Sequence, residues 1–130
     1  MKNNIPRMYK YGNLVNTIYF ALSFLLLTIG IIMVVVGVAN DNKFSLEKGS
    51  ETLGSGIHLF AATILCNIFV VNKAEKEVEQ DLYKSLAPHI LAIVFGAVSM
   101  NPFFVIAGIF GIIVRGQGNK QIEQTEENRE

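Results

Sequence analysis

Charged residues are scarce in this sequence, and those present are unevenly placed. Asp, Glu, Lys and Arg make up 17% of the 130 residues, against about a quarter in soluble domains. None of the four occurs in residues 14–39, 52–72 or 85–114. Because about 20 apolar residues cross a bilayer as a helix, these stretches predict an all-α integral membrane protein and exclude an ordinary soluble domain.

Reactive groups are equally scarce. The single cysteine, Cys66, excludes an intramolecular disulfide and a cysteine-based metal site. No Asp or Glu lies inside the apolar stretches, and HExxH, GxSxG and CxxC motifs are all missing. We therefore expect no enzyme activity, no cofactor and no metal. The 11 basic and 11 acidic residues cancel, so no excess of positive charge favours nucleic acid as a partner.

We expect one four-helix transmembrane domain over residues 1–116, followed by a disordered cytoplasmic tail, 117–130. The first apolar stretch is too long for the h-region of a signal peptide, which spans about 7–15 residues. Asn101-Pro102 divides the last stretch, because the residue before a proline disfavours helix. The four predicted spans are about 14–39, 53–72, 86–100 and 102–116.

The last two spans are short. Each reaches about 22 Å at 1.5 Å per residue, whereas the hydrocarbon core is about 30 Å thick. They predict either a short transmembrane hairpin or a re-entrant one. Between the first two spans, 40–52 reads as a polar loop in which Ser50 or Thr52 caps the next helix. Residues 73–84 contain no helix breaker, so the second helix is expected to continue past the membrane surface.

Basic residues indicate the orientation, because short cytoplasmic loops are enriched in them. The N-terminus, the 73–84 segment and the tail from Arg115 carry three Lys or Arg each, whereas 40–52 carries two. All four tyrosines fall near the basic side, as an interfacial belt would: Tyr9, Tyr11, Tyr19 and Tyr83. We expect a multi-pass protein of the inner (plasma) membrane with both termini in the cytoplasm.

Small and polar residues recur on one face of three predicted helices. Membrane helices use such faces to bring their backbones close together. These stripes indicate either packing within a four-helix bundle or an oligomer interface. Their members are Asn16, Ser23, Gly30 and Gly37 in the first span, Ala92, Gly96 and Ser99 in the third, and Ala107, Gly108 and Gly111 in the fourth.

Polar residues within spans are costly and are therefore functional candidates. His58 and His89 fall at opposite ends of the predicted membrane and cannot share a metal. Asn16, Asn67 and His89 fall at similar depths near the cytoplasmic side. They predict an interhelical hydrogen-bonded cluster, or a proton- or ligand-sensing site centred on His89. Asn101 is explained by its turn.

The length and layout resemble those of the small multidrug-resistance transporters. Those proteins carry an essential glutamate in the first span, where this chain offers only Asn16, so their activity is not expected here. The segment His89–Val114, with its Asn101-Pro102 turn and Ala107-Gly108, resembles the end of small uncharacterised four-helix membrane proteins of low-GC Gram-positive bacteria. This resemblance implies the architecture and no activity.

Together these features predict a non-enzymatic membrane protein that acts through protein–protein contacts, as an accessory subunit or as an immunity or stress protein. The expected partners are the lipid bilayer and either a membrane protein or further copies of this chain. The alternative is a small oligomeric channel or transporter for ions or small solutes, assembled through the first-span stripe. An intramembrane enzyme using His89 lacks a partner acid or metal set.

Overall fold

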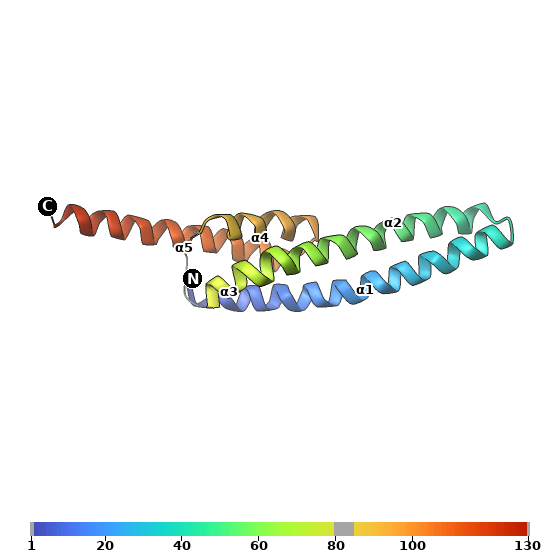
Figure 1. The fold of residues 1–130 in the computed structure, drawn as a ribbon, viewed down its shortest axis with the longest axis horizontal. Coiled ribbons are helices and arrows are strands. Elements are labelled where there is room, and N and C mark those ends of the chain that lie inside the picture. Colours follow the sequence, from blue (N-terminus) through green and yellow to red (C-terminus); the bar gives the residue numbers. More distant parts are fainter. Residues whose placement is uncertain (1, 80–84, 130) are drawn as a thin grey trace. The chain divides into compact units, whose positions relative to one another are not determined.

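The computed structural model describes residues 2–79 and 85–129. Within these ranges the chain is helical apart from short turns, and it contains no strand, which confirms the all-α class for the described part (Figure 1). The elements are η1 (Lys2–Asn4), α1 (Ile5–Ala39), α2 (Lys43–Cys66), the π-helix η2 (Asn67–Glu75), α3 (Lys76–Glu79), α4 (Ala87–Val98) and α5 (Pro102–Glu127).

Three helices are long and apolar enough to cross a membrane. They comprise Lys2–Ala39, Lys43–Glu79 and Pro102–Glu127. α4 has 12 residues and is about 18 Å long. Much of the apolar side-chain surface faces outward, as a lipid-facing surface would, with Leu14 and Val38 more than half exposed.

α1 and α2 both begin earlier in the sequence than the first two predicted spans. α1 starts at Ile5 and α2 at Lys43, so the predicted loop 40–52 is wrong beyond residue 42. Its charged residues are compatible with helix. Charged residues predict the point at which a helix leaves the membrane. The helix itself can continue beyond that point.

The N-terminus of α2 is capped by Asn42, whose Oδ1 accepts a hydrogen bond from the Ser45 backbone amide at 3.2 Å. This is the usual position and chemistry of an N-cap. Ser50 and Thr52, the predicted caps, instead donate to carbonyl oxygens four residues earlier in α2, at 2.9 and 2.7 Å. Both hydroxyls are thereby satisfied inside the helix.

The second helix continues past residue 72 through η2 and α3, as predicted. The rest of that prediction, over 80–84, lies outside the described residues, as does Tyr83. At the other end, α5 extends to Glu127 where the sequence predicts disorder from 117. This stretch is rich in Gln and Glu and contains no proline, and the helix continues through Gly118 and Asn119.

The chain divides into two compact units. We call residues 15–64 the two-helix unit. Residues 1–14 and 65–130 form the core unit. Each is described separately below.

In the two-helix unit, α1 and α2 run side by side in opposite directions (Figure 1). Four of their glycines each face a bulky residue of the other helix. A Cβ at Gly30 would lie 2.8 Å from Leu53 Cγ, and one at Gly37 would lie 2.7 Å from the Leu46 backbone nitrogen. Only glycine permits this approach. The facing pairs are Gly37 with Leu46, Gly49 with Val34, Gly30 with Leu53, and Gly56 with Leu27.

The polar members of the first-span stripe belong to the same seam. Asn16 is buried and donates from Nδ2 to the Thr63 carbonyl oxygen at 3.1 Å. Ser23 is fully buried and donates to the Phe20 carbonyl oxygen of its own helix. The stripe therefore packs against α2 within one chain.

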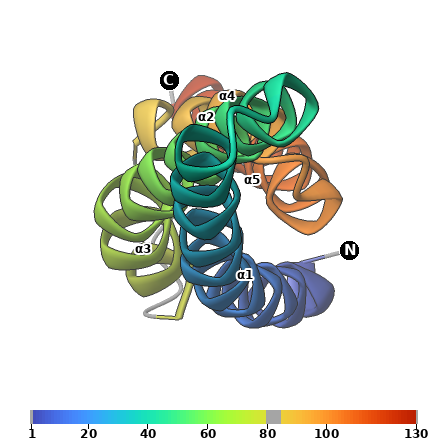
Figure 2. The same ribbon diagram turned by 90° about the vertical axis from the view of Figure 1, so that its right-hand side faces the viewer.

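In the core unit, α4 and α5 pack against each other (Figures 1 and 2). Residues 99–101 form the tight turn between them. Their small residues face each other: a Cβ at Gly96 would lie 2.9 Å from Phe104 Cβ, and one at Gly108 would lie 2.5 Å from the His89 carbonyl oxygen. Ala92 and Ala107 are also buried. The third and fourth predicted stripes thus pack on one another as well. We call Ala87–Val114 the closing hairpin.

Candidate functional site

A buried tyrosine–histidine pair lies in the core unit. The Tyr9 hydroxyl and His89 Nδ1 are 2.9 Å apart and share a hydrogen bond whose direction depends on the histidine tautomer. Neither side chain is exposed to solvent. Because Tyr9 is enclosed, it is not part of an interfacial belt. The pair joins α1 to α4 across 80 positions of sequence.

Local sequence explains how His89 reaches this position. Pro88 occupies the first turn of α4, where its missing N–H costs little, and His89 follows it. Gly111 of α5 lies against the imidazole, and a Cβ there would collide with His89 Nδ1. The glycine thus makes the space that the ring fills.

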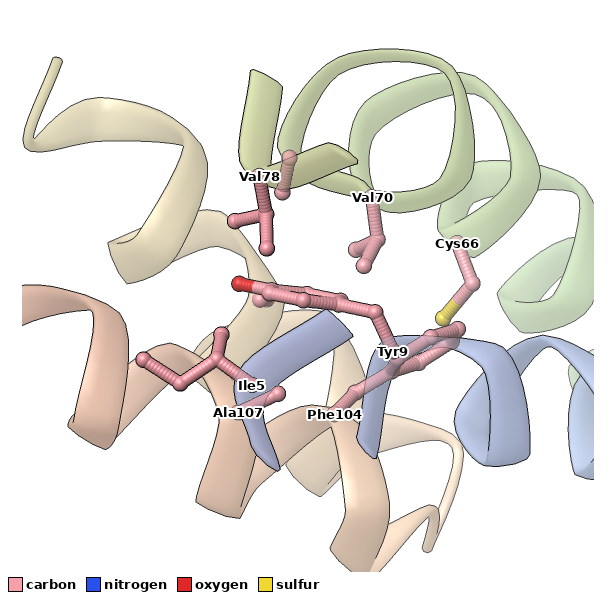
Figure 3. Close-up of a cluster of buried hydrophobic side chains, with 9 residues drawn as sticks. Ile5, Tyr9, Cys66, Val70, Val78, Phe104 and Ala107 are labelled. Carbon is pink, nitrogen blue, oxygen red and sulfur yellow. The ribbon is translucent and has the colours of Figure 1, made fainter. Parts of the chain in front are cut away.

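Apart from His89, Tyr9 packs within a cluster of buried apolar side chains (Figure 3). The Phe104 ring lies 6.3 Å from the Tyr9 ring, tilted by 42°. Phe104 is fully buried, and a Cβ at Gly12 would collide with its ring. The cluster comprises Ile5, Tyr9, Cys66, Val70, Ala74, Val78, Ala92, Phe104 and Ala107.

A second polar contact holds the turn of the closing hairpin. Asn101 Nδ2 donates to the Gly12 carbonyl oxygen at 2.8 Å, and the Asn101 side chain is fully buried. Sequence reasoning assigned Asn101 to its turn and missed this role. The sequence signal for this contact was the asparagine itself, because its side-chain amide is a hydrogen-bond donor that needs a partner within an apolar stretch.

Cys66 lies in the same core and contacts Ser99 at the end of α4. Its Sγ is 3.5 Å from Ser99 Oγ, and Ser99 in turn donates to the Phe95 carbonyl oxygen at 2.8 Å. Cys66 is fully buried and unpaired. It therefore behaves as a small apolar residue with a weak hydrogen bond.

Glu75 is the charged residue of this unit that burial affects most. Its side chain is only 8% exposed, and Oε2 has no hydrogen-bond partner. Burial raises the pKa of this carboxyl, the neighbouring Glu79 raises it further, and Lys10 opposes the rise. Glu75 lies in the π-helix η2. π-Helices are rare in proteins, and those that occur are often found at functional sites.

The predicted cluster of Asn16, Asn67 and His89 is not what the structure contains. Asn16 belongs to the two-helix unit and donates to Thr63, whereas His89 bonds to Tyr9 in the core unit. Asn67 is exposed. Depth along a helix was predicted from the sequence, but the direction in which each side chain points depends on packing.

The chemistry open to this site is limited. No group of three His, Cys, Asp or Glu residues among those described could hold a metal ion. The Tyr9–His89 pair is enclosed by side chains, while a hollow of about 230 Å³ lies elsewhere, between Lys2 and Val114, Gln117, Gly118 and Gln121. The hydrogen bond between Tyr9 and His89 connects α1 to α4, and both side chains are buried.

Comparison with known proteins identifies no relative. No family model, no curated protein and no solved structure matches this sequence.

Proposed function

We propose that this chain is a non-enzymatic, multi-pass membrane protein that acts through contacts with another membrane protein, as an accessory subunit or an immunity or stress protein. In this proposal α1 and α2 cross the inner (plasma) membrane and both termini lie in the cytoplasm. The closing hairpin returns to the side from which it starts. The basic residues counted above support this orientation.

The observation that carries the proposal is the exposed end of α5. The helix continues to Glu127, and every residue from 116 to 129 is exposed. Helices shorter than about 12–15 residues are marginal in water without tertiary packing. A helical extension that the chain itself leaves uncovered is therefore best stabilised by a partner. We call residues 117–129 the α5 extension.

Charge favours a protein partner for the α5 extension over the membrane surface. Residues 117–130 carry two basic and four acidic side chains, and anionic lipids attract polybasic segments. Ile122 is 60% exposed and provides an apolar contact point at its centre. A protein surface with basic groups around an apolar pocket would fit both features.

The internal packing disfavours the alternative, an oligomeric channel built through the first-span stripe. Gly30 and Gly37 face Leu53 and Leu46 of α2 in the same chain. A second copy could use this stripe only by displacing α2. Asn16 is likewise bonded to α2, so its side-chain amide is directed at the seam and lines no path for ions.

The test is recovery of the chain from native membranes in mild detergent through a C-terminal tag. Three forms are compared: the full chain, a form ending at Gly116, and a form in which residues 117–129 are scrambled at constant composition. We expect a stoichiometric second protein with the full chain and its loss from both altered forms. The scrambled form separates sequence-specific docking from charge alone.

Two results would overturn the proposal. One is a second protein that is retained by both altered forms, which would place docking elsewhere. The other is a homo-oligomer recovered alone. That result would favour the channel or transporter, and ion flux in liposomes would then decide.

A further inference from the structure

We propose that the closing hairpin is re-entrant: its turn lies in the cytoplasmic leaflet, and its exposed apolar side faces lipid acyl chains. This rests on the proposed function for the orientation of α1 and α2. The hairpin would make no crossing of its own. The protein would then have two spans and a half-inserted hairpin.

The first observation is the level at which the turn meets α1. Asn101 donates to the Gly12 carbonyl oxygen at 2.8 Å. Gly12 lies two residues before the predicted start of the first span at Leu14, or about 3 Å along the helix. The turn is therefore held near the cytoplasmic end of that span. A hairpin crossing the bilayer would place its turn about 30 Å away, at the outer surface.

The second observation is the level at which the turn meets the second long helix. Ser99 Oγ lies 3.5 Å from Cys66 Sγ. Cys66 is six residues from Asn72, the cytoplasmic end of the predicted second span. This is less than about 9 Å along the helix, because the π-helix η2 between them rises less per residue than an α-helix. Two contacts on two different helices thus place the turn within the cytoplasmic third of a hydrocarbon core about 30 Å thick.

The lengths of the two arms of the hairpin, α4 and α5, agree with a shallow position of its turn in the membrane. α4 has 12 residues, about 18 Å. α5 is longer, but its charge-free part, Pro102–Val114, contains 13 residues and is about 20 Å long. Arg115 follows at once, and the rest of the helix is polar. The charge-free part of each arm is shorter than a hydrocarbon core about 30 Å thick, although α5 as a whole has the length and composition of a span.

The outer surface of the hairpin suits lipid. Residues 85–114 contain no Asp, Glu, Lys or Arg, so no charge is placed in the leaflet. Met100 at the turn is 79% exposed. Exposed apolar side chains also lie along both arms: Ile90, Val94 and Val98 on α4, and Ile106, Ile109 and Ile113 on α5.

The backbone of the turn is also prepared for an apolar medium, where unpaired polar groups are costly. The amides of Ser99, Met100 and Asn101 donate to carbonyl oxygens of α4, at 2.9, 3.2 and 2.7 Å. Met100 adopts φ 56°, a left-handed conformation that lets the chain reverse there. Irregular backbone at membrane depth is tolerated where the protein satisfies it, and these bonds do so.

The experiment measures labelling of cysteines introduced one at a time by a membrane-impermeant maleimide. Asn40→Cys reports the outer turn, Thr125→Cys the cytoplasmic extension, and Met100→Cys the hairpin turn. The wild type, whose only cysteine is the buried Cys66, serves as the blank. Each variant is labelled in intact cells and in inside-out vesicles.

We expect Asn40→Cys to react only in cells and Thr125→Cys only in inside-out vesicles. Met100→Cys should react roughly tenfold more slowly than the accessible site in both preparations, because a thiol in apolar surroundings ionises poorly. Labelling of Met100→Cys in cells at the rate of Asn40→Cys would show a crossing hairpin. Labelling in vesicles at the rate of Thr125→Cys would show a hairpin outside the bilayer. Either result overturns the proposal.

A second measurement tests the lipid contact itself. A fluorophore on Met100→Cys is reconstituted in vesicles of phosphatidylcholine and phosphatidylglycerol that carry bromine either near the headgroup end or near the end of the acyl chains. Stronger quenching by the shallow bromine is expected, whereas no quenching by either lipid would contradict acyl-chain contact. If Asn40→Cys fails to react in cells, the orientation in the proposed function fails instead, and the two failures remain distinguishable.

Discussion

Asn101 and Gly12 are 89 positions apart in sequence, yet the Asn101 side-chain amide donates to the Gly12 carbonyl oxygen at 2.8 Å. The contact attaches the turn of the closing hairpin to α1. Gly12 also accommodates the Phe104 ring from the next turn of α5. One short stretch of α1 therefore receives a polar and an apolar contact from the same hairpin.

Asn101→Ala should destabilise the core unit. The substitution removes the hydrogen bond to Gly12, and loss of a buried partner costs roughly 1–3 kcal/mol. Thermal unfolding in detergent, followed by circular dichroism, measures the change. Asn40→Ala, at an exposed turn position, is the matched control and should leave the midpoint unchanged. Equal midpoints for the two variants would contradict a structural role for the contact.

Gly30→Val should open the seam of the two-helix unit. A Cβ at this position meets both the side chain and the backbone nitrogen of Leu53 at under 3 Å, and overpacking typically costs about 1–3 kcal/mol. Gly54→Val is the control, because nothing lies within 4 Å of a Cβ there. The same unfolding assay compares them. If Gly54→Val proved as damaging as Gly30→Val, β-branching rather than close packing would be responsible.

Gly111→Ala should displace the His89 ring. The added methyl group collides with the imidazole, so we expect a loss of about 1–3 kcal/mol. Gly116→Ala, on the same helix with open space around it, should be neutral or slightly stabilising, because alanine is the better helix former. A neutral Gly111→Ala would mean that His89 can move at little cost.

Tyr9→Phe should weaken the link between α1 and α4. It removes the hydroxyl that bonds to His89 Nδ1 and keeps the ring. Interhelical hydrogen bonds in membrane proteins contribute about 0.6 kcal/mol on average and up to about 1.7. A double-mutant cycle with His89→Phe isolates the pair. A coupling energy near zero would show that the bond contributes nothing to stability.

Glu75→Gln should stabilise the protein at neutral pH and have little effect in acid. Burial raises the pKa of this carboxyl above 4.5, so the folded state holds a proton that the unfolded state has released. The stabilisation of the folded state by this proton is complete below pH 4.5 and is lost as the pH rises through the pKa of Glu75 in the folded state. The advantage of the variant should therefore grow as pH rises.

The measurement is the unfolding midpoint of wild type and Glu75→Gln from below pH 4.5 to neutral pH. Glu123→Gln, on the exposed α5 extension, is the control and should show no pH-dependent advantage. An advantage for Glu75→Gln that is constant with pH would rule out titration of this carboxyl as its cause.

Sequence reasoning was reliable where the controlling interaction is local. Charge-free runs indicated the long apolar helices, and Asn101-Pro102 divided the last run because proline limits the conformation of its neighbour. It failed at helix ends. Charged and polar residues before 53 and after 116 were predicted as loop or disorder, whereas both segments are helical, because charge does not prevent helix formation.

The sequence by itself determined the helical class, the apolar lengths and the spacing of the small residues, since all three depend on neighbours along the chain. Only the tertiary structure decided that Gly30 faces Leu53, that His89 bonds to Tyr9 and that Asn101 reaches Gly12. A stripe of small residues permits close approach of any helix. Which helix approaches, and with which side chains, depends on how the surfaces of all the helices fit together. The spacing of residues along one helix does not specify that fit.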